Sequence, residues 1–139
     1  MILLDASGLY SALNKAQPFH DPVVRQLERE RPPLVLSPFV LAELDYLLLS
    51  RGGVAAELAF LDDLAAYELA TLDTADVDAC RDVIRAYSDI PVGLADASLV
   101  VLAGRYGTER VLTLDERHFR ALRTPSGQRF TVLPMDEPQ

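Results

Sequence analysis

Short continuous hydrophobic runs alternate along this chain with longer stretches in which hydrophobic residues recur every three or four positions. These runs, some of which include a polar residue, have the length and composition of β-strands, and they cover residues 1–4, 34–36, 68–72, 110–114 and 130–133. The periodic stretches are typical of amphipathic α-helices, and they cover residues 6–13, 22–31, 38–50, 54–66, 74–87, 92–104 and 116–122. Strands that alternate with one or two helices predict an α/β fold, with a single parallel sheet of about five strands flanked by helices.

Local signals indicate where two of these helices begin. Asp21 and Ser37 each precede a proline, and an Asp or Ser before a proline is a common N-terminal signature of a helix. We therefore expect helices to begin at Pro22 and Pro38. Gly52–Gly53 is expected to end the second of these helices before the next one starts.

The length and composition predict one globular domain. A chain of 139 residues with 50% hydrophobic and 24% charged residues is neither disordered nor too small to bury a core. We expect the domain to span residues 1–135, with 136–139 as a frayed polar end. No hydrophobic run approaches the roughly 18 residues of a membrane span, and the first residues do not resemble a signal peptide. The expected location is therefore the cytoplasm, without membrane contact, and the lone Cys80 is expected in the core.

Four acidic residues occupy positions at which a carboxylate is unusual, either among hydrophobic residues on a helix or directly after a strand. Asp96 and Glu43 each have only hydrophobic residues or glycine at the positions three and four away on their predicted helices. Asp96 should therefore point toward the interior, where an unpaired carboxylate is costly, and Glu43 is a second acid on a hydrophobic helix face. Asp5 and Asp115 directly follow predicted strands.

The predicted topology brings these four acids together. In an open parallel sheet the ligand crevice lies beyond the carboxyl ends of the strands, near the point where strand order reverses. Asp5 and Asp115 end strands there, and Glu43 and Asp96 lie in early turns of helices that start at the same edge. Four adjacent carboxylates repel unless protons or a cation intervene. Oxygen ligands without a cysteine cluster or a histidine pair indicate Mg²⁺ or Mn²⁺ rather than zinc, and such a site suits phosphodiester hydrolysis.

Each acid also has an ordinary structural alternative. Asp5 and Asp115 could serve only as helix N-caps, Asp96 could pair with a buried arginine, and Glu43 could lie on the surface if its helix were phased differently. The four alternatives would have to hold independently, whereas a metal site explains all four acids at once.

Four segments that contain these acids resemble the acidic motifs of the PIN domain. The resemblance runs essentially from end to end and is greatest to the VapC-type toxins of bacterial toxin-antitoxin modules. The segments are Leu-Leu-Asp-Ala-Ser at 3–7, Ser-Pro-Phe-Val-Leu-Ala-Glu at 37–43, Gly-Leu-Ala-Asp-Ala at 93–97 and Leu-Thr-Leu-Asp-Glu-Arg-His-Phe at 112–119.

This resemblance implies a Mg²⁺-dependent endoribonuclease, the toxin of a type II toxin-antitoxin system. Asp5 and Asp96 would be the principal metal ligands. Asp115 would support a metal directly or through water, and Glu43 would orient the attacking water or complete the acidic cluster. The reaction would leave a 5′-phosphate and a 3′-hydroxyl, and the number of metal ions stays open.

The resemblance also implies supporting residues and partners. The hydroxyls of Ser7 and Thr113 would fix the orientation of the carboxylates. The substrate would be RNA, the protein would form a homodimer, and a VapB-type antitoxin would dock on the hydrophobic helices over 7–14 and 54–66.

Three further polar residues follow Asp115 closely in the sequence. Arg117 and Arg120 could contact RNA phosphates, or they could lie on a solvated helix face. We expect His118 to be an ordinary histidine at the surface or at the edge of the core, because a metal-dependent site does not need it as a base.

Other functions fit the sequence less well. A net charge of −8 argues against an ordinary basic nucleic-acid binder. A Mg²⁺-binding, aspartate-rich receiver domain for signalling is the main non-catalytic alternative, followed by a catalytically silent domain that only binds partners. Receiver domains and aspartyl-phosphate phosphatases need a lysine beside their acids, and the only lysine here is Lys15.

Overall fold

The computed structural model describes residues 1–137 and contains one parallel sheet. Its strand order is β3-β2-β1-β4-β5, and all neighbouring strands are parallel. The predicted α/β fold with five parallel strands is therefore confirmed. The strands are β1 (Ile2–Leu4), β2 (Leu34–Leu36), β3 (Glu68–Leu69), β4 (Arg110–Leu112) and β5 (Thr131–Leu133).

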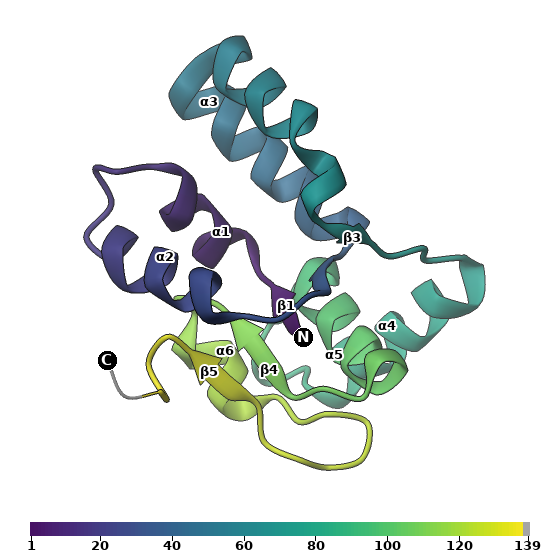
Figure 1. The fold of residues 1–139 in the computed structure, drawn as a ribbon. Helices are drawn as coiled ribbons and strands as arrows, with labels where there is room; N and C mark the ends of the chain where they lie inside the picture. Colours follow the sequence, from purple (N-terminus) through teal and green to yellow (C-terminus); the bar gives the residue numbers. More distant parts are fainter. Residues whose placement is uncertain (138–139) are drawn as a thin grey trace.

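Helices cover both faces of this sheet (Figure 1). Strands β2 and β3 lie to one side of β1, whereas β4 and β5 lie to the other. Because crossovers between parallel strands are right-handed, the helices before β3 and those after it lie on opposite faces. The helices are α1 (Ala6–Leu13), α2 (His20–Arg29), α3 (Pro38–Asp62), the short 3₁₀ helix η1 (Leu64–Ala66), α4 (Thr74–Ala86), α5 (Leu94–Tyr106) and α6 (Glu116–Ala121).

The core lies between the sheet and these helices. All three residues of β1 have no exposed surface, as expected for a central parallel strand that is covered on both faces. Helix α5 is also buried along most of its length, and Cys80 of α4 is buried as predicted. Within residues 1–137, no helix has the length and hydrophobicity of a membrane span.

The start of one helix differs from the prediction, whereas the break in another is confirmed. Helix α2 begins at His20, after Phe19, rather than at Pro22. Pro22 is accommodated in the first turn because the N–H groups of that turn have no partners within the helix. The segment labelled α3 consists of two helices that meet at Gly53, whose backbone is non-helical, with a φ of 79° that is available mainly to glycine. The break predicted at Gly52–Gly53 between the helices over 38–50 and 54–66 is therefore confirmed.

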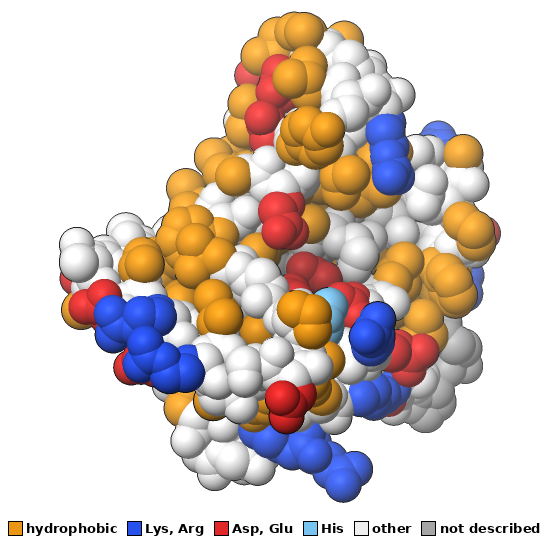
Figure 2. Space-filling model, turned by 180° about the vertical axis from the view of Figure 1, so that it is seen from behind, with side chains coloured by type: hydrophobic (Ala, Val, Ile, Leu, Met, Phe, Trp, Pro, Cys, Tyr) orange, Lys and Arg blue, Asp and Glu red, His pale blue; other side chains and the backbone are white. Residues whose placement is uncertain are grey.

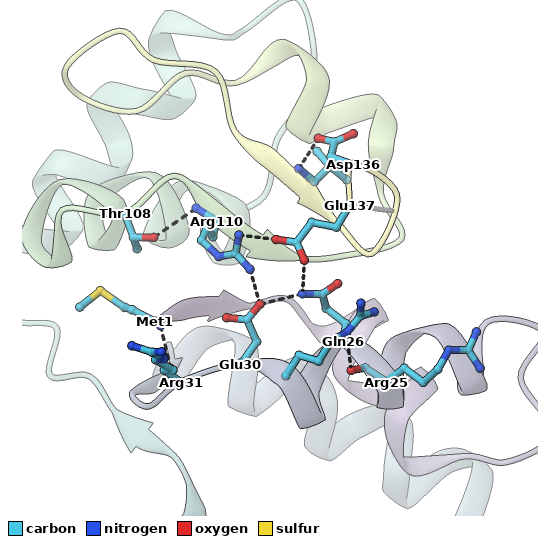
Figure 3. A network of polar contacts seen from close by, with 11 residues as sticks. Met1, Arg25, Gln26, Glu30, Arg31, Thr108, Arg110, Asp136 and Glu137 are labelled. Atoms are coloured by element: carbon cyan, nitrogen blue, oxygen red, sulfur yellow. Dashed lines mark hydrogen bonds and ion pairs between the residues drawn. The ribbon is translucent and has the colours of Figure 1, made fainter. Parts of the chain in front are cut away.

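The chain end is more ordered than the expected frayed tail. Asp136 pairs with Arg120, and Glu137 pairs with Arg110. Arg110 also pairs with Glu30, whose side chain is only 4% exposed, so the end of the chain is tied to β4 and α2 (Figure 3). The other two residues of the expected tail, 138 and 139, lie outside the described residues.

Candidate metal centre and active site

The candidate site lies where the order of the strands reverses, between the carboxyl ends of β1 and β4. The backbone N–H of Asp5 donates a hydrogen bond to the carbonyl oxygen of Leu112, at 3.0 Å. The ends of the two strands therefore stay adjacent, and the residues that follow each strand lie side by side. This is the position at which open α/β sheets bind their ligands.

Asp5 is the buried carboxylate of the site. It is 5% exposed, and its Oδ2 accepts hydrogen bonds from Thr113 Oγ1 at 2.6 Å and Ser7 Oγ at 3.0 Å. Burial raises the pKa of Asp5, while these two hydroxyls counteract part of the effect. The structure thus places both predicted hydroxyls on the same carboxylate oxygen, which fixes its orientation.

Asp96 lies in the first turn of α5, and its side chain is 15% exposed. Burial raises the pKa of Asp96 to about 7, and the negative charges of Asp5, Asp115 and Glu43 add to the rise. Each of these three acids is therefore close enough to act on Asp96. The four acids predicted from distant parts of the chain converge at one place.

Asp115 combines helix capping with a position in the acidic cluster. As the N-cap of α6, it accepts a hydrogen bond at Oδ1 from the backbone N–H of His118, at 3.1 Å. Its Oδ2 lies 2.6 Å from His118 Nδ1. Asp115 is therefore a helix N-cap, as the sequence analysis considered. Capping uses Oδ1 and leaves Oδ2 facing the site.

His118 belongs to the site, although the sequence prediction gave it no role there. Its Nδ1 also lies 3.5 Å from Asp96 Oδ2. Figure 2 shows acidic side chains gathered beside a histidine near the middle of one face of the molecule. The Asp-x-x-His spacing at 115–118 could have indicated the contact with Asp115, because residues three apart share a helix face. The contact with Asp96 joins α6 to α5. These helices are separate in the sequence, so the local spacing at 115–118 could not indicate this contact.

Glu43 lies on α3 at the exposed side of the cluster, so the hydrophobic helix face predicted around it does not bury the residue. Partial burial raises the pKa of Glu43, and the charge of Asp5 raises it further. The start of α3 is fixed by Ser37, whose Oγ accepts a hydrogen bond from the N–H of Phe39 and also bonds Ser98 Oγ of α5 at 2.7 Å. This buried serine pair joins the beginnings of the two helices that carry Glu43 and Asp96.

Residues 2–124 match the family of the PIN domain. The chain belongs to the PIN-domain family. This match covers all four acids and His118, so the cluster lies entirely within the PIN domain.

Individual relatives of this PIN domain include VapC proteins. It is 46% identical to Ribonuclease VapC26 of Mycobacterium tuberculosis over 135 residues, which are 96% of this chain and the whole of that protein. A solved structure of DNA-bound VapBC from Salmonella typhimurium matches 95% of this chain and 98% of its own, with 25% identity and a TM-score of 0.65. A solved structure of Mycobacterium tuberculosis VapC20, a toxin that cleaves the sarcin-ricin loop, matches 84% of this chain and 91% of its own. That match has a TM-score of 0.78 and 17% identity, and it supports the fold.

PIN domains generally bind a divalent metal, and the residues of this chain fit one. Donor atoms of Asp96, Asp115 and His118 lie within 4.8 Å of one another. The negative charges that raise the pKa of Asp96 come from neighbouring carboxylates, and a cation among them would relieve this repulsion. The donor set is dominated by carboxylate oxygens, as in sites for Mg²⁺ and Mn²⁺.

The two arginines of α6 have different surroundings. The guanidinium group of Arg120 bonds both carboxylate oxygens of Asp136, at 2.7 and 2.8 Å, and also Glu116 at 2.8 Å. Arg117 is exposed, and it forms no ion pair with any residue in 1–137. Of the two, Arg117 has the free guanidinium.

Proposed function

We propose that this PIN domain is a metal-dependent endoribonuclease and the toxin of a VapBC-type toxin-antitoxin pair. The main observation that supports this proposal is that four carboxylates from separate parts of the chain converge at one edge of the sheet. The 46% identity to Ribonuclease VapC26 over almost the whole chain supports RNA as the substrate.

Asp5 and Asp96 would hold Mg²⁺ or Mn²⁺, with Asp115 in contact directly or through water. The ion would offset the charge of the scissile phosphate and acidify a water molecule. Ser7 and Thr113 keep the carboxylate of Asp5 in one orientation, so the ligand set is ordered before substrate arrives. The raised pKa of Asp96 would fall once the repulsion between carboxylates is relieved.

Glu43 would orient the attacking water. Its carboxylate lies at the exposed side of the cluster, where RNA enters, and its raised pKa suits a group that accepts a proton from water. Attack in line with the leaving 3′-oxygen would give a 5′-phosphate and a 3′-hydroxyl. Arg117, which directly precedes His118 on α6, would bind a neighbouring phosphate of the RNA.

The antitoxin would cover hydrophobic surface on α1 and α3. Leu13, Val54 and Leu58 are exposed there, and a cavity of about 320 Å³ between the two helices is lined by Tyr10 and Leu48 among others. A basic segment of a VapB-type antitoxin would complement the net charge of −8. We also propose a homodimer and, because the substrate is cellular RNA, a cytoplasmic location.

Cleavage of single-stranded RNA by the purified protein tests this proposal. We expect cleavage with Mg²⁺ or Mn²⁺ and none with excess EDTA. Asp96→Asn should reduce the rate by at least about a hundredfold while the protein stays folded, because it removes a metal ligand. Asp89→Asn is the matched control, since Asp89 is exposed and outside the cluster, and it should cleave like wild type. Unchanged cleavage by Asp96→Asn, or full cleavage in EDTA, would contradict the proposal.

The receiver-domain alternative gains no support from the structure. Lys15, the only lysine, is exposed beyond the C-terminal end of α1, whereas Asp5 immediately precedes that helix. The eight residues of α1 separate the two by roughly 12 Å, too far for the lysine to contact a phosphorylated aspartate.

A further inference from the structure

His118 is one of only two histidines in the chain, and its ring nitrogen faces the acidic cluster. Nδ1 lies 2.6 Å from Asp115 Oδ2 and 3.5 Å from Asp96 Oδ2. A single nitrogen atom is thus adjacent to two carboxylates from different helices. The ring is 21% exposed, so it is partly shielded from bulk water in this position.

The backbone around His118 fixes the position of the ring. The N–H of His118 bonds the capping carboxylate of Asp115. The next residue, Phe119, is 1% exposed and packs edge to face against Phe130, with 5.5 Å between the ring centroids. Because the helix is held on both sides of the histidine, the approach of Nδ1 to the carboxylates follows from the fold rather than from a flexible surface side chain.

The spacing of the donor atoms fits one ion. The nitrogen of His118 and one oxygen each of Asp96 and Asp115 lie within 4.8 Å of one another. Ligands on opposite sides of an octahedral ion with bonds of ~2.1 Å are ~4.2 Å apart. Small side-chain adjustments would therefore bring all three atoms onto the same ion.

We propose that His118 is a nitrogen ligand of the divalent ion, through Nδ1, and that it makes the site prefer Mn²⁺ to Mg²⁺. This inference rests on the proposed metal-dependent function and refines it. Mg²⁺ favours oxygen ligands and gains little from an imidazole, whereas first-row transition ions bind mixed nitrogen and oxygen sites well. The Asp5 side of the site offers oxygen only, and the Asp96–Asp115 side adds the nitrogen.

The alternative is that His118 only donates a hydrogen bond to Asp115. In that arrangement the imidazole would orient a carboxylate ligand, as histidine partners often do, but it would not touch the ion. Its loss would then weaken Mn²⁺ and Mg²⁺ binding to a similar extent. The two arrangements therefore differ in metal selectivity and in whether nitrogen is bonded to the ion.

Pulsed electron paramagnetic resonance of the full chain loaded with Mn²⁺ distinguishes them. We expect a coupling to directly bonded ¹⁴N in wild type and in His20→Asn. His20 is the matched control, because its Nδ1 contacts the backbone oxygen of Ser11 rather than the cluster. His118→Asn should lose the coupling, although its amide can still hydrogen-bond to Asp115. Bound Mn²⁺ without nitrogen coupling in wild type would overturn the inference, whatever the variants do.

Metal affinities give the second measurement. We expect His118→Asn to weaken Mn²⁺ binding about tenfold and Mg²⁺ binding less than about threefold, so that the preference for Mn²⁺ shrinks. An equal loss for both ions would overturn the inference and leave the nuclease proposal standing. Wild-type protein that binds neither ion would instead refute the proposed metal-dependent function itself.

Discussion

Asp96 is the residue at which burial and charge oppose ionisation most clearly. The sequence predicts that it points inward and needs a partner. The structure confirms the inward position and adds a neighbour that the sequence did not indicate, because His118 Nδ1 lies 3.5 Å away. The histidine lowers the pKa of Asp96, but burial and three other carboxylates outweigh it. In the absence of a cation, the residue is thus close to half protonated near pH 7.

The two arginines of α6 allow a prediction that separates RNA binding from stability. Arg117→Ala should raise the KM for RNA several-fold with little change in the free energy of unfolding, because its guanidinium is free to contact a phosphate. Arg120→Ala should lower the free energy of unfolding by about 1 kcal/mol, as expected for an exposed ion-pair network, and should change the KM less. Steady-state cleavage kinetics and urea unfolding measure the two effects.

Asp136→Asn is the control for this pair of variants. It removes the charge that Arg120 binds and leaves both arginines in place, so its unfolding free energy should resemble that of Arg120→Ala. If Arg120→Ala raised the KM as much as Arg117→Ala while Asp136→Asn did not, Arg120 would contact RNA as well.

At the scale of elements, the approach of α1 to the end of β4 shapes the site. A side chain at Gly8 would place its Cβ 2.6 Å from the carbonyl oxygen of Leu112, a backbone atom that cannot move alone. Glycine therefore lets α1 lie against β4, which brings Ser7 within hydrogen-bond distance of Thr113 at 3.2 Å. The hydroxyls that orient Asp5 depend on this contact between a helix and a strand.

Gly8→Ala should disturb both the fold and the site. We expect the free energy of unfolding to fall by roughly 1–3 kcal/mol, as for other overpacked positions, and kcat to fall at least tenfold because Ser7 and Thr113 separate. Gly93→Ala is the matched control for stability, since its Cβ would meet nothing within 4 Å, and it should cost less than about 1 kcal/mol. Wild-type stability and kcat in Gly8→Ala would show that α1 can shift without cost.

The sequence predicts most elements but fewer of their boundaries. The sequence locates all five strands, and hydrophobic residues dominate the inner ones because strands of a covered parallel sheet are buried on both faces. The edge strand β3, Glu68–Leu69, is exposed. The cap at Ser37 is confirmed, because its signal is local and the side chain bonds the first turn. The start of α2 at His20 is not predicted, because Phe19 provides no side-chain cap that a pattern could reveal. The break between the helices over 38–50 and 54–66 is predicted, because the glycine pair is a local signal and Gly53 adopts a non-helical backbone.

At the scale of the whole molecule, the topology assembles the site. Sequence reasoning brings the four acids together because the carboxyl ends of parallel strands share one edge, whatever the order of the strands. It cannot find the contact between His118 and Asp96, which depends on how α6 packs beside α5. It also cannot find that Asp136 and Glu137 hold the chain end, because their partners Arg120 and Arg110 are distant in sequence.

The stability of the metal-free protein should fall as pH rises, through the contribution of Asp96. Its pKa is about 7 in the folded protein and 3.8 in the reference state. A raised pKa in the folded state means that protonation favours folding. The contribution of Asp96 is therefore complete below about pH 4 and is lost as pH rises to about 7. Burial also raises the pKa of Asp5, which acts in the same direction.

Comparison with Asp96→Asn isolates this effect from the rest of the molecule. Exposed acids with lowered pKa values, such as Asp136, stabilise the fold as pH rises, but they are common to both proteins and cancel in the difference. In EDTA, urea unfolding should show similar stabilities at pH 4 and a variant more stable than wild type by about 1–3 kcal/mol at pH 8.

Saturating Mn²⁺ should make wild type the more stable protein at pH 8, because the ion binds the ionised cluster of wild type and stabilises the folded state by mass action. A wild type that is at least as stable as the variant in EDTA at pH 8 would mean that repulsion among these carboxylates is already balanced without a cation.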